Sequence, residues 1–243
     1  MMTVFPWLKR AVDLVYPRNC RFCSGPVADA DRAAICAACL RTVKWIEPPF
    51  CGQCALPFAG KIDKPFVCGY CGKLKFHFSR AVAACRAEGI VRDSIHRFKY
   101  NREMYYGPHL AEWLVTAARR WIVWRDVDVI VPVPLYPRKK REREFNQAEY
   151  LARALSREGG IPLDTGRLRR VKETVTQTRL DAKARADNLR GAFAVRGGDV
   201  FANKRVALVD DVFTTGATMD SCARVLRDAG AADVMAVAVA RGV

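Results

Sequence analysis

The 243-residue sequence contains no long hydrophobic run. Hydrophobic residues make up 51% of the chain, yet no stretch approaches the roughly 20 consecutive apolar residues of a membrane-spanning helix. The N-terminal residues also lack the pattern of a secretory signal peptide, in which a charged start precedes an apolar core. These absences argue against a membrane span, and we expect a globular protein of the cytoplasm.

Acidic residues and histidines are scarce. Asp and Glu together number 25 against 41 Lys and Arg, so the formal net charge is +16. Such an excess of positive charge favours polyanionic partners, either nucleic acid or phosphate-rich small molecules. Of the three histidines, His96 and His109 have no partner pattern, and His77 is best explained as a surface residue.

Cysteine is abundant, but mainly in one part of the chain. Eight of the ten cysteines form four Cys-x-x-Cys pairs, separated by 12, 11 and 13 residues. Each pair places two sulfur atoms on one side of a tight turn, as half of a tetrahedral zinc site requires. The pattern therefore predicts two structural Zn²⁺ ions, with these ligands: Cys20, Cys23, Cys36, Cys39, Cys51, Cys54, Cys68 and Cys71.

Disulfides and redox-active pairs are the competing explanations for these cysteines. With no sign of secretion, a reducing compartment favours zinc thiolates, and four regularly spaced pairs have no reason to be separate redox centres. Consecutive pairs can share a zinc ion, or an interleaved arrangement can join the first pair to the third. We favour the consecutive grouping because it closes shorter loops at a lower entropic cost.

A second distinctive segment lies between residues 206 and 218. Residues 206–209 are typical of a buried strand, which we expect to stop at Asp210 and Asp211. Residues 219–229 have helical periodicity, and the helix start can bind a phosphate through its N–H groups and its dipole. The turn between strand and helix would complete this cradle with small and hydroxyl-bearing residues: Thr214, Thr215, Gly216, Ala217 and Thr218.

The two adjacent carboxylates narrow the class of ligand. Side by side and next to an anion site, Asp210 and Asp211 repel each other unless they bind hydroxyl groups or a metal ion. A sugar phosphate meets that demand. The alternative is a strand that ends in a solvated acidic turn, but strand, turn chemistry and helix all agree with a ligand site.

A basic stretch follows an earlier predicted strand at residues 128–134. Basic residues at the carboxyl end of a parallel strand face the ligand crevice of an open α/β sheet. Alone, this stretch would more often be a solvated patch, but beside a phosphate cradle it becomes a candidate site for pyrophosphate or nucleic acid. The candidate contacts are Arg138, Arg141 and Arg143, and Asn146 can cap the next helix.

Composition divides the chain into two expected domains, residues 1–75 and 76–243. The first contains a short amphipathic helix at residues 5–15 and the cysteine pairs. The second has room for one α/β core, with further strands at 79–86 and 233–240 and a long helix at 104–124. Residues 174–190 are polar, and we interpret them as a mobile cover over the ligand crevice or as an ordinary surface connection.

The segment from 206 to 218 resembles the motif that binds 5-phosphoribosyl-1-pyrophosphate (PRPP) in type I phosphoribosyltransferases. The resemblance implies that Asp210 and Asp211 bind the ribose 2′- and 3′-hydroxyls and that Thr214 to Thr218 surround the 5′-phosphate.

Further motifs in the expected order make nearly the whole chain similar to the ComF family of competence-associated proteins. They are Pro132-x-Pro-Leu, Arg141-x-Arg-x-Phe-Asn-Gln, Thr176-Gln177, Arg185, Asn188 and Gly191-Ala-Phe. One departure is Glu144, where the family commonly has glycine; it adds negative charge and removes backbone freedom.

The resemblance implies a type I phosphoribosyltransferase-like α/β fold with a mostly parallel sheet and an N-terminal double zinc-ribbon domain. One functional hypothesis is an enzyme that transfers a phosphoribosyl group from PRPP with Mg²⁺ and releases pyrophosphate, which the basic residues would stabilise. The other is a non-catalytic protein of DNA uptake and natural transformation that binds single-stranded DNA or senses PRPP, with DNA-uptake helicases or recombination proteins as partners. No residue stands out as a base for an acceptor.

Overall fold

The computed structural model describes residues 19–27, 34–62, 64–173 and 189–242. The helix expected at residues 5–15 and nearly all of the segment 174–190 lie outside these ranges. Among the described residues, no helix combines the length and the apolar character needed to cross a bilayer.

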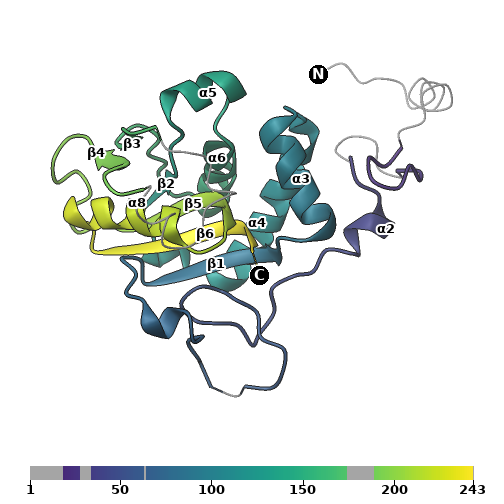
Figure 1. The fold of residues 1–243 in the computed structure, drawn as a ribbon, viewed down its shortest axis with the longest axis horizontal. Helices are drawn as coiled ribbons and strands as arrows, with labels where there is room; N and C mark the ends of the chain where they lie inside the picture. Colours follow the sequence, from purple (N-terminus) through teal and green to yellow (C-terminus); the bar gives the residue numbers. More distant parts are fainter. Residues whose placement is uncertain (1–18, 28–33, 63, 174–188, 243) are drawn as a thin grey trace.

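A four-stranded parallel sheet forms the centre of the molecule (Figure 1). Its strands, in spatial order, are β1 (Arg80–Arg86), β6 (Asp233–Arg241), β5 (Arg205–Phe213) and β2 (Val129–Pro132). A small antiparallel pair, β3 (Leu168–Arg170) and β4 (Phe193–Val195), stands apart from it. The near-continuous apolar sequences of β1, β5 and β6 explain their burial on both faces, as is usual for parallel strands.

Helices cover both faces of this sheet. The larger ones are α3 (Gly89–Tyr100), α4 (Gly107–Trp121), α6 (Gln147–Gly159) and α8 (Ala217–Asp228). Alternate residues of β5 enter two hydrophobic cores: Ala207 and Val209 pack with α3, α4 and α6, whereas Val206 and Leu208 pack with α8. The architecture confirms the expected α/β fold with a mostly parallel sheet.

The remaining helical pieces are short: α2 (Ala37–Leu40), α5 (Pro137–Arg143) and 3₁₀ turns at Cys71–Lys73, Met104–Tyr106 and Trp124–Asp126. The long helix predicted for residues 104–124 is therefore shorter, with a 3₁₀ turn before α4 and another after it.

The prediction that strand β5 stops at Asp210 and Asp211 is wrong. The strand continues to Phe213. Its neighbour β2 ends opposite Val209, whereas the nine-residue β6 continues alongside and pairs Asp210 with Ala238. The partner strand thus extends β5 beyond the apolar run. Asp211 lies on the side of α3, where it meets Lys99, whereas the charge of Asp210 acts on Cys222 of α8 and on Arg170 of β3.

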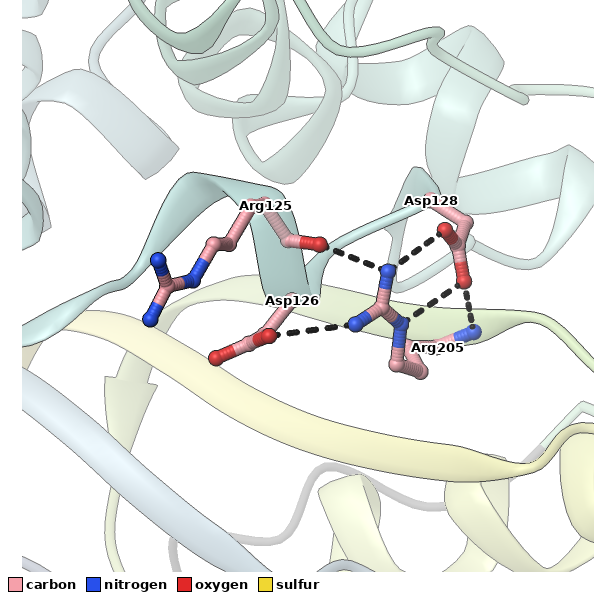
Figure 2. A network of polar contacts seen from close by, with 4 residues as sticks. All are labelled: Arg125, Asp126, Asp128 and Arg205. Atoms are coloured by element: carbon pink, nitrogen blue, oxygen red, sulfur yellow. Dashed lines mark hydrogen bonds and ion pairs between the residues drawn. The ribbon is translucent and has the colours of Figure 1, made fainter.

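The opposite end of β5 is tied to β2 by a polar network (Figure 2). The Arg205 guanidinium donates from Nε and Nη2 to the two carboxylate oxygens of Asp128, at 3.0 and 2.9 Å, and from Nη1 to Asp126 at 3.1 Å. The backbone N–H of Arg205 also donates to Asp128, and Nη2 reaches the Arg125 carbonyl. These contacts hold the starts of the two strands together.

Candidate ligand site and metal centres

The eight predicted zinc ligands form two four-cysteine clusters. Within each, the four sulfur atoms lie within 4.8 Å of one another, and they group as Cys20, Cys23, Cys36 and Cys39 and as Cys51, Cys54, Cys68 and Cys71. Zinc–sulfur bonds of about 2.3 Å in a tetrahedron place sulfurs roughly 3.8 Å apart, so both clusters fit Zn²⁺. The consecutive grouping is confirmed, and the interleaved alternative is wrong.

Backbone amides prepare one sulfur of each cluster for metal binding. Although burial opposes ionisation, N–H donors lower the pKa of Cys20 to about 6 and that of Cys51 to about 7. The donor to Cys51 from across its cluster is the Cys68 N–H, at 3.2 Å. Because zinc binds thiolates, these donors favour the ligating form.

The first cluster is docked against α3 and α4. The ring of Phe22 lies 5.7 Å from the ring of Tyr106 and 5.4 Å from the Arg97 guanidinium. The backbone N–H of Ala34 donates to Nε2 of the buried His109, at 3.3 Å. His109 therefore has a structural contact in this interface.

The predicted phosphate turn lies between β5 and the N-terminus of α8. Gly216 caps that helix with a φ of +85°, and a Cβ at this position would lie only 2.8 Å from the Phe213 ring. A side chain is therefore disfavoured both by conformation and by space. Thr215 Oγ1 accepts from the Ala217 N–H at 3.4 Å. The five turn residues are thus together at a helix N-terminus, where N–H groups and the dipole favour an anion.

The acid pair divides into a buried and a partly exposed carboxylate. Asp211 is buried, and Lys99 Nζ of α3 lies 2.8 and 2.6 Å from its two oxygens. Asp210 faces the other side, where burial and the neighbouring Asp211 raise its pKa to about 7. Although burial opposes it, the charges of both aspartates raise the pKa of Lys99. Lys99 is a site residue that the sequence analysis missed, because no sequence spacing relates it to Asp211.

Three cations lie within electrostatic range of one another, and one of them, Arg170, also of Asp210. Burial lowers the pKa of both Lys139 and Arg170, the charge of Arg143 lowers both further, and the charge of Arg170 lowers that of Lys139 as well. The charge of Asp210 acts on Arg170 in the opposite direction. The Arg143 guanidinium lies 4.9 Å from the Tyr100 ring. We call Lys139, Arg143 and Arg170 the cation cluster; only Arg143 was predicted, since Arg170 comes from the distant strand β3.

The other two predicted arginines lie elsewhere on α5, which is a helix rather than a turn. Pro137 starts it and an Arg138–Glu142 ion pair of 3.0 Å spans one turn, as suits a charged helix. Arg138 also pairs with Glu173. Arg141 lines a cleft of about 540 Å³ between α5 and β3, together with Lys140, Arg169 and Arg170. Arg170 therefore joins this cleft to the cation cluster.

The link between α5 and α6 contains the predicted helix cap, Asn146, and a residue in a strained backbone conformation, Glu144. Asn146 caps α6 by accepting from the Ala148 N–H at 3.0 Å, as predicted. Glu144 has a left-handed backbone with a φ of +67°, which favours glycine, and it pairs with Arg102 at 2.8 Å. The loss of backbone freedom expected at Glu144 thus falls where a positive φ is required.

Comparison with known proteins gives the following similarities. The family model described as a double zinc ribbon domain matches residues 11–75. Competence protein F of Haemophilus influenzae is 33% identical over 227 residues, 92% of this chain and 96% of its own. DNA utilization protein YhgH of Escherichia coli is 32% identical over 228 residues, 91% and 96% of the two chains. Competence protein ComFC of Streptococcus pneumoniae is 27% identical over 151 residues, 62% and 63%.

Two solved structures show distant similarity. The allosteric regulatory enzyme of purine biosynthesis aligns with 54% of this chain and 25% of its own, at 22% identity and a TM-score of 0.38. The purine phosphoribosyltransferase from Pyrococcus horikoshii aligns with 56% of this chain and 72% of its own, at 17% identity and a TM-score of 0.34.

Proposed function

The chain belongs to the competence protein F family, and on that basis we propose that it binds PRPP with Mg²⁺ and acts in DNA utilization in the cytoplasm. One observation carries the ligand assignment. A hydroxyl-rich turn and a helix N-terminus directly follow the strand that carries the partly exposed Asp210, and the charge of Asp210 acts on Arg170 of the cation cluster. A ligand with a phosphate at one end, ribose hydroxyls in the middle and a pyrophosphate at the other end matches these three features.

Each part of PRPP has a partner in this proposal. The 5′-phosphate binds the turn from Thr214 to Thr218, and the pyrophosphate binds the cation cluster. Asp210 accepts hydrogen bonds from the ribose hydroxyls. Asp211 was expected to bind the same hydroxyls. Because Asp211 is buried and contacts Lys99, Asp210 alone makes the direct contact in this proposal. Asp211 then holds the end of β5 in place.

The arrangement supports phosphoribosyl transfer as a reaction. The bond from ribose C1 to the pyrophosphate oxygen breaks as an acceptor nucleophile bonds to C1, and negative charge grows on the leaving pyrophosphate. The cation cluster stabilises that charge, and the turn and Asp210 orient the sugar. Mg²⁺, which prefers phosphate and carboxylate oxygens, would bind with PRPP and share this role.

Calorimetric titration of the purified chain with PRPP and Mg²⁺ tests the assignment. We expect saturable binding, and at least tenfold weaker binding for Asp210→Asn. The matched control is Asp228→Asn, an exposed change of the same kind at the far end of α8. Absence of binding to the unmodified chain, or equal binding by both variants, would refute the proposal. Release of pyrophosphate from PRPP with candidate acceptors then tests turnover.

A second function, binding of single-stranded DNA, is favoured by the cleft beside α5. Prolines and Leu135 provide apolar surface in it, and its charged lining is mostly basic: Lys140, Arg141, Arg169 and Arg170 against Glu144 and Glu149, of which Glu149 pairs with Lys140. A neighbouring cleft of about 340 Å³ contains Arg153 and Arg157 and shares Thr165 with the first. Apolar surface for bases and a row of cations for phosphates are what a flexible polyanion requires.

Fluorescence anisotropy with labelled single-stranded DNA at several salt concentrations tests this function. We expect Arg141→Gln with Arg169→Gln to weaken binding and to reduce the slope of log K against log salt by about 1.4, for two lost phosphate contacts. Arg92→Gln with Arg125→Gln removes the same charge from other exposed positions and serves as the control. Binding that does not respond to salt would exclude this function.

A further inference from the structure

The second four-cysteine cluster lies directly against the candidate phosphate turn, and one buried arginine joins them. Arg241, the last residue of β6, donates from Nε to the Cys54 carbonyl at 2.9 Å and from Nη1 to the Phe213 carbonyl at 3.3 Å. Its Nη2 lies 3.7 Å from Sγ of Cys54, and its guanidinium lies 5.1 Å from the Phe213 ring. A single side chain thus contacts both a predicted zinc ligand and the residue that immediately precedes the turn.

Further contacts connect the same two regions. The hydroxyl of Tyr70, which lies between Cys68 and Cys71, donates to the Thr215 carbonyl at 3.4 Å. Phe76 lies 3.3 Å from the position that a Cβ of Gly216 would occupy. The backbone N–H of His77 donates to Asp220 in the first turn of α8, at 2.6 Å. Arg241 therefore contacts the residue before the turn, while Tyr70, Phe76 and His77, in and just after the second cysteine cluster, contact the turn and the start of α8.

Electrostatics explains why an arginine is suited to this position. Four thiolates and one Zn²⁺ carry a net charge of −2, which the single positive charge of a buried guanidinium halves, and its donors are fixed in one plane. Arg241 is only 6% exposed, so its removal would leave the Cys54 and Phe213 carbonyls without that donor in a buried place. The metal centre in turn fixes the backbone at Cys54.

The first three residues of the turn are not held by regular secondary structure. Thr214 is exposed, and the three residues from Thr214 to Gly216 belong to neither strand nor helix. A phosphate site made of backbone N–H groups works only if their directions are fixed, since small misplacements cost much binding and rate. Carbonyls held at Phe213 and Thr215 fix the Phe213–Thr214 and Thr215–Gly216 peptide planes, and with them the directions of the N–H groups of Thr214 and Gly216.

We propose that the second zinc centre is a working part of the phosphate site, with Arg241 and Tyr70 as positioning residues for the turn. The inference rests on the proposed binding of PRPP. Ligand affinity then depends on the metal at Cys51, Cys54, Cys68 and Cys71, while the first centre, docked on α3 and α4, matters much less.

Titration of the full chain with PRPP and Mg²⁺ is the first test. We expect Arg241→Met to weaken binding at least tenfold, within the range typical of residues that orient metal ligands, and Tyr70→Phe to weaken it about threefold. Arg241→Lys keeps the charge but not the two-sided contact, and should restore binding only in part. The control is Arg86→Met, in register with Arg241 on the neighbouring strand. Melting temperatures of all variants separate weaker binding from loss of folding.

Cobalt spectroscopy is the second test and needs no change at Arg241. Cys23→Ser confines Co²⁺ to the second centre, and Cys68→Ser confines it to the first. We expect PRPP to shift the visible absorption of cobalt in the second centre and to leave that of the first centre unchanged.

The outcomes distinguish the two proposals. If the unmodified chain does not bind PRPP, the proposed function fails and this inference fails with it. If it binds PRPP, but the cobalt spectrum is unaffected and Arg241→Met binds equally well, only the coupling to the zinc centre is refuted.

Discussion

Single residues decide how the acid pair can work. Asp210 and Asp211 are adjacent in sequence, but Asp211 is buried against Lys99, whereas Asp210 is partly exposed and is the one proposed to contact the ligand. Burial and Asp211 raise the pKa of Asp210 to about 7, so it holds a proton under mildly acidic conditions. Its protonation state therefore changes within the physiological pH range.

The pH dependence of stability should report on Asp210. The folded chain retains a proton that the unfolded chain releases between the ordinary pKa of 3.8 and about 7. The resulting stabilisation is complete below pH 4 and is lost as the pH rises through 7. Charged neighbours that act on it are Asp211, Lys99 and Arg170. In urea denaturation from pH 4.5 to 7.5, Asp210→Asn should become steadily more stable relative to the unmodified chain. A constant difference would contradict the raised pKa.

Glu144 offers a prediction about backbone strain. A left-handed backbone costs a residue with a side chain about 1 kcal/mol, and the exposed ion pair with Arg102 returns little of it. Glu144→Gly should therefore raise the free energy of unfolding by roughly 0.5–1 kcal/mol in denaturant titrations. Glu142→Gly, inside α5, should lower it by about as much. A destabilised Glu144→Gly variant would show that the ion pair outweighs the strain.

At the scale of elements, β5 organises the molecule. Its first residue, Arg205, is bound to Asp128 and Asp126 (Figure 2). Its second half carries Asp210 and Asp211 and leads into the candidate phosphate turn. Its pairing with β6 over the whole length keeps these two ends in a fixed relation. The network at one end thereby supports the position of the ligand site at the other.

The contribution of this Arg205 network to the stability of the fold should depend on pH. Hydrogen bonds from Arg205 lower the pKa of Asp128 from 3.8 to about 2, so its stabilisation is present above pH 4 and is lost as the pH falls toward 2. Asp128→Asn should lower the melting temperature by about 2 °C at pH 7, and by less at pH 3. The control is Asp199→Asn, an exposed aspartate. Calorimetry would contradict the assignment if the two variants melted alike at pH 7.

At the scale of the whole molecule, two zinc centres brace two different parts of the core. The first contacts α3 and α4, and the second contacts the ends of β5 and β6. The residues behind the formal charge of +16 have different surroundings. Many arginines pair with carboxylates, while Arg141 and Arg169 line the cleft beside α5. Positive charge is thus available where an anionic ligand can enter.

Metal removal tests the bracing directly. Elemental analysis should give two zinc ions per chain, and a strong chelator should lower the melting temperature by about 5 °C or more, because ligand binding to the folded state alone stabilises it. Zinc added back should restore it. Fewer than two ions per chain, or a melting temperature that does not respond to chelation, would contradict two structural centres.

The sequence alone determined the features that depend on neighbours along the chain. The spacing of the cysteine pairs predicted both metal clusters and their grouping, because each ligand pair is one local turn and the loops between pairs are short. The segment from Val206 to Thr218 predicted a strand, a turn and a helix for the same reason.

Only the tertiary structure decided which distant side chains complete the sites. Lys99 meets Asp211 across 112 residues of sequence, and Arg241 meets Cys54 across 187. The end of β5 was also set from outside, since the length of β6 extends it beyond the apolar run. Such contacts follow from how the sheet brings strands side by side, and no local pattern records them. The candidate phosphate turn is therefore one continuous segment of sequence, while the side chains that hold it, Tyr70 and Arg241, come from distant parts of the chain.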